Sequence, residues 1–378
     1  MSNIDELIEK LCPDGVSYTE LGEVCEIFNG AAFKSEFFNT DDIGLPLIRI
    51  RDINTGFSST FYSGEYSDQY IVNDGDLLIG MDGDFKANLW NHGTALLNQR
   101  VCRLQNFKGV LKDYIYYIVH NALKKIHDET SKTTVKHLSS RVLSDVTIPV
   151  PPLEVQEEIV RILDTFTELE AELEAELEAR RKQYEFYRNE LLTFNERERE
   201  RVRWVTLGEI AKIKNGKDWK NCQPGNVPVY GSGGIMTYID TPVYDQPTVL
   251  IPRKGTITNL FYVDQPFWNV DTIYYTEIDT QKIIPKYFYY FMKTINLMSL
   301  DTGSGRPSLT QKILNKLCIP IPPLEEQERI VSILDKFEAL VNDISIGLPA
   351  ELAARRKQYE HYRNKLLTFD KKPEKKSA

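Results

Sequence analysis

Two long stretches of the chain carry apolar residues at intervals of three and four positions, with charged residues between them. This spacing places the apolar side chains on one face of an α-helix. The first stretch follows Pro151-Pro152 and predicts a helix from Leu153 to Asn195, roughly 65 Å long at the usual rise per residue. Its opening turns are acidic, as a helix dipole favours. The apolar stripe consists of Ile159, Ile162, Phe166, Leu169 and Leu173.

A lone helix cannot bury such a stripe, so the pattern predicts a coiled coil with a partner helix. The second stretch, from Leu324 to about Phe369, is the candidate partner. Gly347 and Pro349 lie inside it and predict a kink or an interruption. Its stripe consists of Ile330, Ile333, Phe337, Leu340 and Ile344.

The pattern ahead of each predicted helix is different, with short β-like runs separated by turn residues. Each of these regions ends in a tyrosine-rich helical stretch, at 114–119 and 287–292, whose aromatic rings we interpret as core. The predicted fold is therefore mixed α/β (α+β), with two globular β-rich domains separated by two long helices. The predicted strands are 46–51, 76–80, 100–104, 249–252 and 272–275.

Sequence repeats give this architecture a pseudo-two-fold character. The motif Ile-Pro-x-Pro-Pro-Leu-Glu opens both helices, at 148–154 and 319–325, and Arg-Arg-Lys-Gln-Tyr-Glu recurs at 180–185 and 355–360. The offset between copies grows from 171 to 175, so the second arm is four residues longer. The predicted organisation is a first domain at 1–150, a first helix at 151–200, a second domain at 201–322, a second helix at 323–370 and a basic disordered tail at 371–378.

The first helix contains a tetrapeptide, Glu-Leu-Glu-Ala, three times in succession over residues 168–179. A four-residue period inserted in a heptad pattern locally unwinds a supercoil without breaking its seam. Spacer length is therefore the quantity that such repeats can adjust.

Charge is distributed unevenly along the 378 residues, whose net charge is −9. Residues 153–200 hold 15 acidic and 7 basic residues, while 204–323 hold 9 and 12 and 18–150 hold 17 and 13. The acid is thus concentrated on the predicted spacer helix, and the second domain is mildly basic. If the protein binds nucleic acid, the contacts of the acidic first domain would have to be local patches.

The remaining composition predicts a cytoplasmic protein with reduced thiols. The five cysteines are widely separated and lack a C-x-x-C spacing, so a disulfide framework or a metal site is not expected. The N-terminus does not have the pattern of a signal peptide, and no apolar run could cross a membrane. Motifs for binding adenosyl groups or nucleotide phosphates and for hydrolase chemistry are missing, which indicates a binding protein without its own catalytic residues.

Polar and basic residues in the presumed loops are the candidate DNA contacts. Arginine can pair with guanine, and lysine can hold phosphate; ordinary solvated loops are the alternative for any one of them. His137 corresponds to Ser308-Leu309 of the other copy and is expected to be structural or to contact phosphate. The candidates are Lys86, Asn98, Arg100, Lys132, Thr133 and Lys136 in the first domain, and Lys214, Lys217, Lys220, Ser232, Arg253, Lys254, Thr256, Ser304 and Arg306 in the second.

Together, the duplicated proline motifs, the duplicated Arg-Arg-Lys-Gln-Tyr-Glu, the two Leu-Gly-Glu openings at 21–23 and 207–209 and the tetrapeptides resemble the specificity subunit of type I restriction–modification enzymes. The resemblance implies a non-catalytic subunit with two target-recognition domains, each reading half of a split sequence in double-stranded DNA. The two domains would be held apart by the two long helices, which would run antiparallel as a coiled coil. Its helices would dock two methyltransferase (M) subunits and the restriction/translocase (R) subunits. S-adenosylmethionine, ATP and Mg are expected on those partners, and no cofactor on this chain. The expected spacer and docking residues are Phe166, Leu169, Leu173, Leu177, Tyr184, Phe337, Leu340 and Tyr359.

A non-catalytic coiled-coil scaffold that binds proteins or surface polymers is an alternative function that the duplicated layout also permits. Binding to duplex DNA that weakens with salt would distinguish the two.

Overall fold

A computed structural model describes residues 2–129, 136–194, 202–301, 305–343 and 345–372. The chain forms two compact units. Unit 1 consists of Met1–Ala171 and Ala354–Ala378, and unit 2 of Glu172–Ala353. Each unit therefore contains one globular part and a length of each helical arm.

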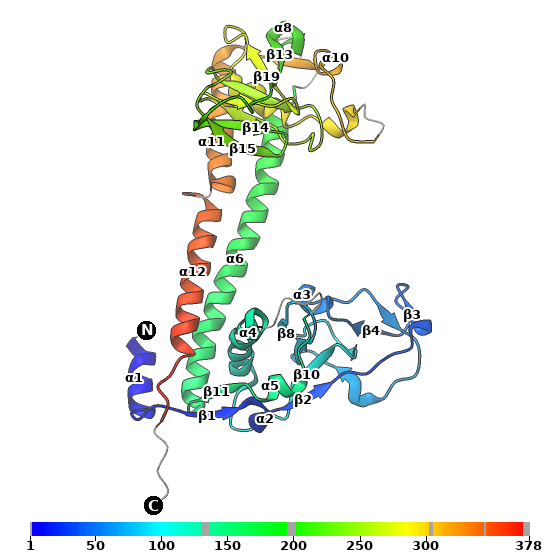
Figure 1. Ribbon diagram of the computed structural model, residues 1–378, viewed down its shortest axis with the longest axis vertical. Helices are drawn as coiled ribbons and strands as arrows, with labels where there is room; N and C mark the ends of the chain where they lie inside the picture. The colour runs from blue at the N-terminus through cyan, green and yellow to red at the C-terminus, as the bar shows by residue number, and fades with distance from the viewer. Residues whose placement is uncertain (1, 130–135, 195–201, 302–304, 344, 373–378) are drawn as a thin grey trace, which may run out of the picture. The chain divides into compact units, whose positions relative to one another are not determined.

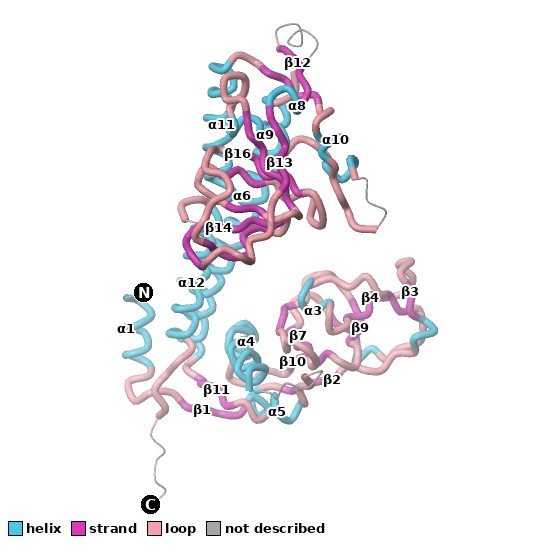
Figure 2. Tube along the Cα trace, turned by 45° about the horizontal axis from the view of Figure 1, so that its top comes forward, coloured by secondary structure: helices cyan, strands magenta, loops and turns pink. Residues whose placement is uncertain are grey.

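Unit 1 is built around a four-stranded sheet of order β2-β10-β7-β8. Strand β7 is buried along its whole length, and helix α4 lies beside the sheet (Figure 2). Tyr114, Ile115 and Ile118 of this helix are buried in the same core. A five-stranded sheet of order β3-β5-β4-β9-β6 and the pair β1-β11 complete the unit. Its strands are β1 Ser17–Glu20, β2 Glu26–Asn29, β3 Phe38–Asn39, β4 Leu45–Ile48, β5 Phe61–Tyr62, β6 Ile71–Val72, β7 Leu77–Gly80, β8 Ala87–Leu89, β9 Ala95–Leu97, β10 Val101–Gln105 and β11 Thr147–Val150. Its shorter helices are α1 Ser2–Leu11, α2 Leu21–Val24, η1 Ser35–Phe37, α3 Asp52–Thr55, η2 Asp68–Tyr70, α4 Lys112–Glu129 and α5 Ser140–Ser144.

Unit 2 repeats this plan with a four-stranded sheet of order β13-β19-β16-β17. Strand β16 is buried throughout, and helix α9, which begins with Pro285 in its first turn, packs next to it. A three-stranded sheet of order β15-β14-β18 and the pair β12-β20 accompany the central sheet. The strands are β12 Arg203–Thr206, β13 Ala211–Asn215, β14 Pro224–Gly231, β15 Gly234–Ile239, β16 Thr248–Pro252, β17 Phe261–Val263, β18 Trp268–Asn269, β19 Ile273–Ile278 and β20 Cys318–Ile321. The shorter helices are α8 Leu207–Ile210, α9 Pro285–Met292, η3 Leu297–Leu300 and α10 Gln311–Leu314.

The first arm is one unbroken helix, α6 Leu153–Leu191, whereas the second consists of α11 Leu324–Asn342 and α12 Leu348–Leu366 (Figure 1). The interruption predicted from Gly347 and Pro349 is confirmed. A Cβ atom on Gly347 would lie 2.4 Å from the Ala339 carbonyl oxygen, so only glycine fits there. Pro349 lies in the first turn of α12, where a missing N–H breaks no helical hydrogen bond.

Within each unit the arms run antiparallel and are joined by an equivalent aromatic stack. In unit 1 the ring centroids of Phe166 and Tyr362 lie 5.4 Å apart, and in unit 2 those of Phe337 and Tyr187 lie 5.6 Å apart. Phe166 and Phe337 occupy the same position in the two copies of the sequence, as do Tyr187 and Tyr362. The predicted pseudo-two-fold repeat therefore extends to individual side-chain contacts.

A buried glutamine ties each arm to its globular part in the same way. Gln156 accepts a hydrogen bond from the Leu111 N–H at 2.8 Å and donates to the carbonyl oxygens of Gly109 and Pro151. Gln327 makes the matching three bonds to Ile284, Lys282 and Pro322. Because both glutamines are fully buried, their side chains fix where each helix begins.

The leucines of the tetrapeptide repeat turn progressively into the core. Leu169 is 41% exposed, Leu173 is partly buried against the core of unit 2, and Leu177 is 8% exposed. A step of four residues exceeds one helical turn by about 40°, so each repeat carries its leucine further around the helix. The regular seam predicted through Leu169 is therefore displaced at that residue, and Leu163, which is fully buried, continues the stripe instead.

The predicted strands and tyrosine-rich helices are confirmed as β4, β7, β10, β16, β19, α4 and α9. At the start of the predicted tail, Lys371 forms a β-bridge with Val16. Residues 373–378 of that tail, and Ile344 of the predicted second stripe, lie outside the described residues. Among the helices that the structure describes, none is long and apolar enough to cross a membrane.

Candidate nucleic-acid interface

The candidate loops of unit 1 converge at the end of strand β7. The N–H of Met81 donates to the Arg100 carbonyl at 2.9 Å, and the N–H of Leu138 donates to the Met81 carbonyl at 2.7 Å. Gly83 donates to the Lys136 carbonyl at 3.0 Å, and Asp82 forms a β-bridge with His137. Three segments far apart in sequence thus form one backbone frame, which we call the unit 1 frame (residues 81–83, 100 and 136–138).

Unit 2 has the same backbone frame at the end of strand β16. Arg253 donates to the Thr272 carbonyl at 2.8 Å, Leu309 donates to the Arg253 carbonyl at 2.9 Å, and Lys254 bridges to Ser308. Gly255 and Gly83 both have positive φ, the conformation that favours glycine. The unit 2 frame (residues 253–255, 272 and 307–309) therefore matches the first residue for residue, and His137 corresponds to Ser308 as the sequence predicted.

Side chains at matched positions of the two frames differ in charge and chemistry. In unit 1, one oxygen of the Asp82 carboxylate lies 2.6 Å from Nδ1 of His137, and the other lies 3.3 Å from Nε of Arg100. In unit 2 the matched position carries Lys254, whose ammonium lies 3.6 Å from the Asp271 carboxylate. The framework is therefore shared while the surface it presents is not.

The other unit 1 candidates have different environments. Asn98 accepts a hydrogen bond from the Gln99 N–H at 2.8 Å, and its backbone bridges to Ala31, so it shapes the turn. The Lys136 ammonium is half-buried and donates to the His127 carbonyl. Lys86 is exposed, next to a loop in which Phe85 has positive φ. Lys132 and Thr133 lie outside the described residues.

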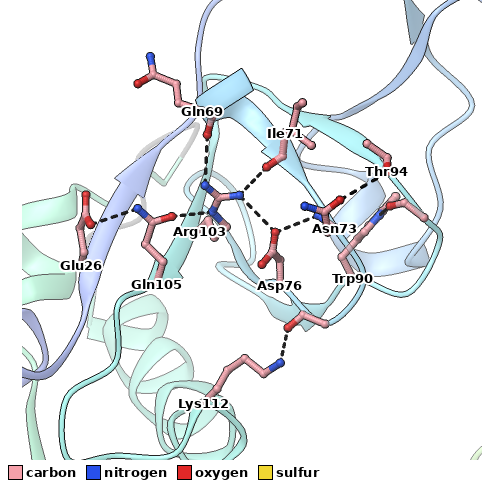
Figure 3. Close-up of polar contacts among 12 residues, drawn as sticks. Glu26, Gln69, Ile71, Asn73, Asp76, Trp90, Thr94, Arg103, Gln105 and Lys112 are labelled. Atoms are coloured by element: carbon pink, nitrogen blue, oxygen red, sulfur yellow. Dashed lines mark hydrogen bonds and ion pairs between the residues drawn. The ribbon is translucent and has the colours of Figure 1, made fainter. Parts of the chain in front are cut away.

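A second arginine near the unit 1 frame is fully engaged inside the protein. The Arg103 guanidinium, on strand β10, donates to Gln105, to the Ile71 and Gln69 carbonyl oxygens and to Asp76 (Figure 3). Its side chain is only 13% exposed. Asp76 also accepts from the Asn73 N–H, so this network fastens the sheets together. Arg103 therefore serves the fold, and Arg100 is the exposed arginine of the frame.

In unit 2 a glycine-rich turn lies next to the frame. Ser232 donates its N–H to the Thr272 hydroxyl at 3.3 Å, and its carbonyl accepts from Asn259 at 3.2 Å. Arg253 is half-buried and its guanidinium reaches the Asp271 carbonyl at 3.4 Å. Thr256 and Arg306 are exposed, and Ser304 lies outside the described residues. The predicted residues Ser232, Arg253 and Lys254 are thus brought together.

Lys214, on strand β13, and two lysines in the loop after that strand form a separate group. Lys214 pairs with Glu277 at 3.4 Å. Lys217 and Lys220 are exposed, in a loop held by the Trp268 indole N–H, which donates to the Lys217 carbonyl at 3.0 Å. Of the three lysines, only Lys214 has an acidic partner among the described ion pairs.

Apolar residues on strand β15 were missed by reasoning from the sequence. Ile235 and Met236 are 48% and 60% exposed, and Met236 is the extra residue of a β-bulge opposite Val229 and Tyr230. Bulges redirect side chains and are common beside functional sites. No periodicity marks this position, because a bulge depends on pairing with a strand elsewhere in the sequence.

The residues expected in the spacer or at a docking surface divide into two groups. Leu177 and Tyr184 are buried, and Phe166, Leu173, Phe337 and Tyr359 are half-buried, so these residues hold the arms together. Leu169 and Leu340 remain exposed, at 41% and 39%. Phe186, exposed by 63%, was missed and adds to the apolar surface of α6.

Comparisons with known proteins agree on one family. A family model described as "Type I restriction modification DNA specificity domain" matches residues 13–179 and again 200–354. The chain is 31% identical to a putative type I restriction enzyme specificity subunit of Haemophilus influenzae, over 98% of this chain and all of that one. It is 47% identical to the EcoBI specificity subunit of Escherichia coli, over 38% of this chain and 31% of that one.

The fold also resembles a solved structure. The S subunit of a type I restriction–modification system from M. genitalium superimposes with a TM-score of 0.59 at 19% identity, covering 93% of this chain and 96% of that one. The chain therefore belongs to the family of type I restriction–modification specificity subunits, which are non-catalytic proteins that recognise DNA and confer specificity on the methyltransferase and endonuclease complex.

Proposed function

We propose that this protein recognises a bipartite DNA target, one half read by the globular part of unit 1 and the other by that of unit 2. The observation that carries the proposal is the pair of matched frames. The backbone hydrogen bonds of the two frames match, but the side chains at matched positions differ. Unit 1 has Asp82, Arg100 and His137 where unit 2 has Lys254, Thr272 and Ser308, respectively. Two readers on one scaffold with different side chains suit two different half-sites, because bases are distinguished by side-chain contacts.

The arms would hold the two readers at a set spacing and dock the partner subunits. A helix without a break, such as α6, transmits length directly, at about 1.5 Å per residue. The exposed apolar residues Leu169, Phe186 and Leu340 supply surface for two methyltransferase (M) subunits, and restriction/translocase (R) subunits complete the complex. In this role the partner subunits bind S-adenosylmethionine, ATP and Mg, and the complex modifies DNA in the cytoplasm.

Mapping methylated bases tests the proposal directly. The full chain would be expressed with its methyltransferase partner, and genomic DNA sequenced for modified bases. We expect one motif made of two short specified segments separated by unspecified bases in constant number. A continuous motif would contradict two separate readers.

Binding of purified full chain to duplex DNA gives a second measurement. The affinity for DNA should fall as the salt concentration rises, because contacts to phosphates release counterions and that release becomes less favourable in high salt. Salt-independent binding would favour a protein scaffold instead.

A further inference from the structure

The Asp82 carboxylate stands inside the presumed DNA-facing surface of unit 1, where a negative charge would repel phosphate. Its side chain is 20% exposed, and its two oxygens are directed at His137 and Arg100. Because one carboxylate approaches two cationic or donor groups, it can hold both in place. Its location is set by the frame rather than by a flexible loop, since residues 81 and 83 are hydrogen-bonded on either side of it.

Arg100 is held at one end of its guanidinium. The contact with Asp82 involves Nε, and no hydrogen bond of the Nη groups is found within the described parts of the chain. The side chain is 55% exposed, in contrast to Arg103, whose three nitrogens all bond inside the protein. Two adjacent exposed Nη groups on a restrained arginine form a fork that matches the O6 and N7 acceptors of guanine.

We propose that Arg100 reads a guanine in the half-site of unit 1, and that Asp82 is the positioning residue that aims it. The proposal rests on the proposed function and deepens it. The matched position in unit 2 is Thr272, whose hydroxyl already accepts from the Ser232 N–H, so the same slot there supplies no arginine fork. The two half-sites would therefore differ at the base that faces this slot.

The conservative variant Arg100→Lys is the decisive test, made in the full chain within the methylating complex. Lysine keeps the positive charge but lacks the planar fork, so a phosphate contact would tolerate it and guanine readout would not. We expect one G·C position, in one half-site only, to become relaxed. Discrimination there should fall about 5- to 150-fold, as loss of a bidentate pair implies.

Two further variants test the role of Asp82. Asp82→Ala should relax the same position, and the double variant should be no worse than Arg100→Lys alone, because both changes disable one contact. Arg141→Lys, on α5 of the same unit and 91% exposed, is the matched control and should leave the motif unchanged.

Three results would overturn this assignment while leaving the bipartite function intact. They are a wild-type motif without G·C in either half, an unchanged motif in Arg100→Lys, or relaxation of a different base in Asp82→Ala. A motif without two separate halves would instead refute the proposed function itself.

Discussion

Deleting one tetrapeptide, residues 172–175, should shorten the unread gap of the DNA target and leave both half-sites unchanged. The deleted residues lie inside the unbroken helix α6 and form one of three identical units. Every remaining residue therefore keeps the same neighbours along the helix. Four residues correspond to about 6 Å of helix, and a base pair of duplex DNA to about 3.4 Å, so the gap should shrink by about one or two base pairs.

The structure also indicates that the deletion is compatible with folding. Leu173, the apolar residue removed, is only partly buried, and Leu169 takes its place four residues before Leu177. The second arm is already interrupted between Asn342 and Leu348, where a change in length can be absorbed.

Methylation sequencing of the variant measures the gap directly. Duplication of residues 172–175 should lengthen it by the same amount, and Glu172→Gln with Glu174→Gln, which alters charge at constant length, should not change it. A constant gap together with altered half-site bases would refute the reasoning, because length would then not set the spacing.

Three further predictions concern the matched features of the two units. Arg253→Ala should weaken reading of the half-site of unit 2 and spare the other, as scored by the methylated fraction at single-base variants of each half; equal loss at both would place Arg253 in the framework. Gln156→Ala and Gln327→Ala should each lower the free energy of unfolding of their own unit by about 2–5 kcal/mol, because one buried N–H and two carbonyl oxygens lose their hydrogen-bond partner. Denaturant unfolding, followed by hydrogen exchange in each unit, measures this change. Phe166→Ala and Phe337→Ala should each lower the free energy of local opening of the arms by about 1 kcal/mol or more, because the stacked ring of Tyr362 or Tyr187 loses its partner. Faster proteolysis of the arms would report this loss, and an unchanged rate in both variants would show that the stacks do not hold the arms together.

The architecture was predictable because its signals are local and repeated. The apolar stripes of α6 and α11, the break at Gly347 and Pro349, and the buried strands β7 and β16 all follow from spacing and residue type. Repetition added information that one copy would lack, since it identified matched positions such as His137 and Ser308 before any contact was known.

The candidate interface was predictable only as a set of loops. The arrangement of Asp82, Arg100 and His137 depends on backbone pairing across 55 residues, which no window of sequence shows. Charge alone also fails to separate Arg100 from Arg103, three residues away, because their difference lies in which neighbours meet the guanidinium. Leu169 belongs to the predicted apolar stripe but is 41% exposed, because a four-residue period carries successive leucines around the helix.

The acidic balance of the first domain restricts DNA contacts there to local patches, and two ion pairs show how acidic residues can belong to such patches. Two of the acidic residues there contact arginines: Asp76 pairs with Arg103 within the fold, and Asp82 pairs with Arg100 at the surface. A surface that reads bases needs a few restrained donors more than a uniform positive field, because nonspecific attraction to phosphate adds affinity without discrimination. If Arg100 reads a base as proposed, the net charge of the domain is a poor guide to DNA recognition, because the acid paired with that arginine positions it.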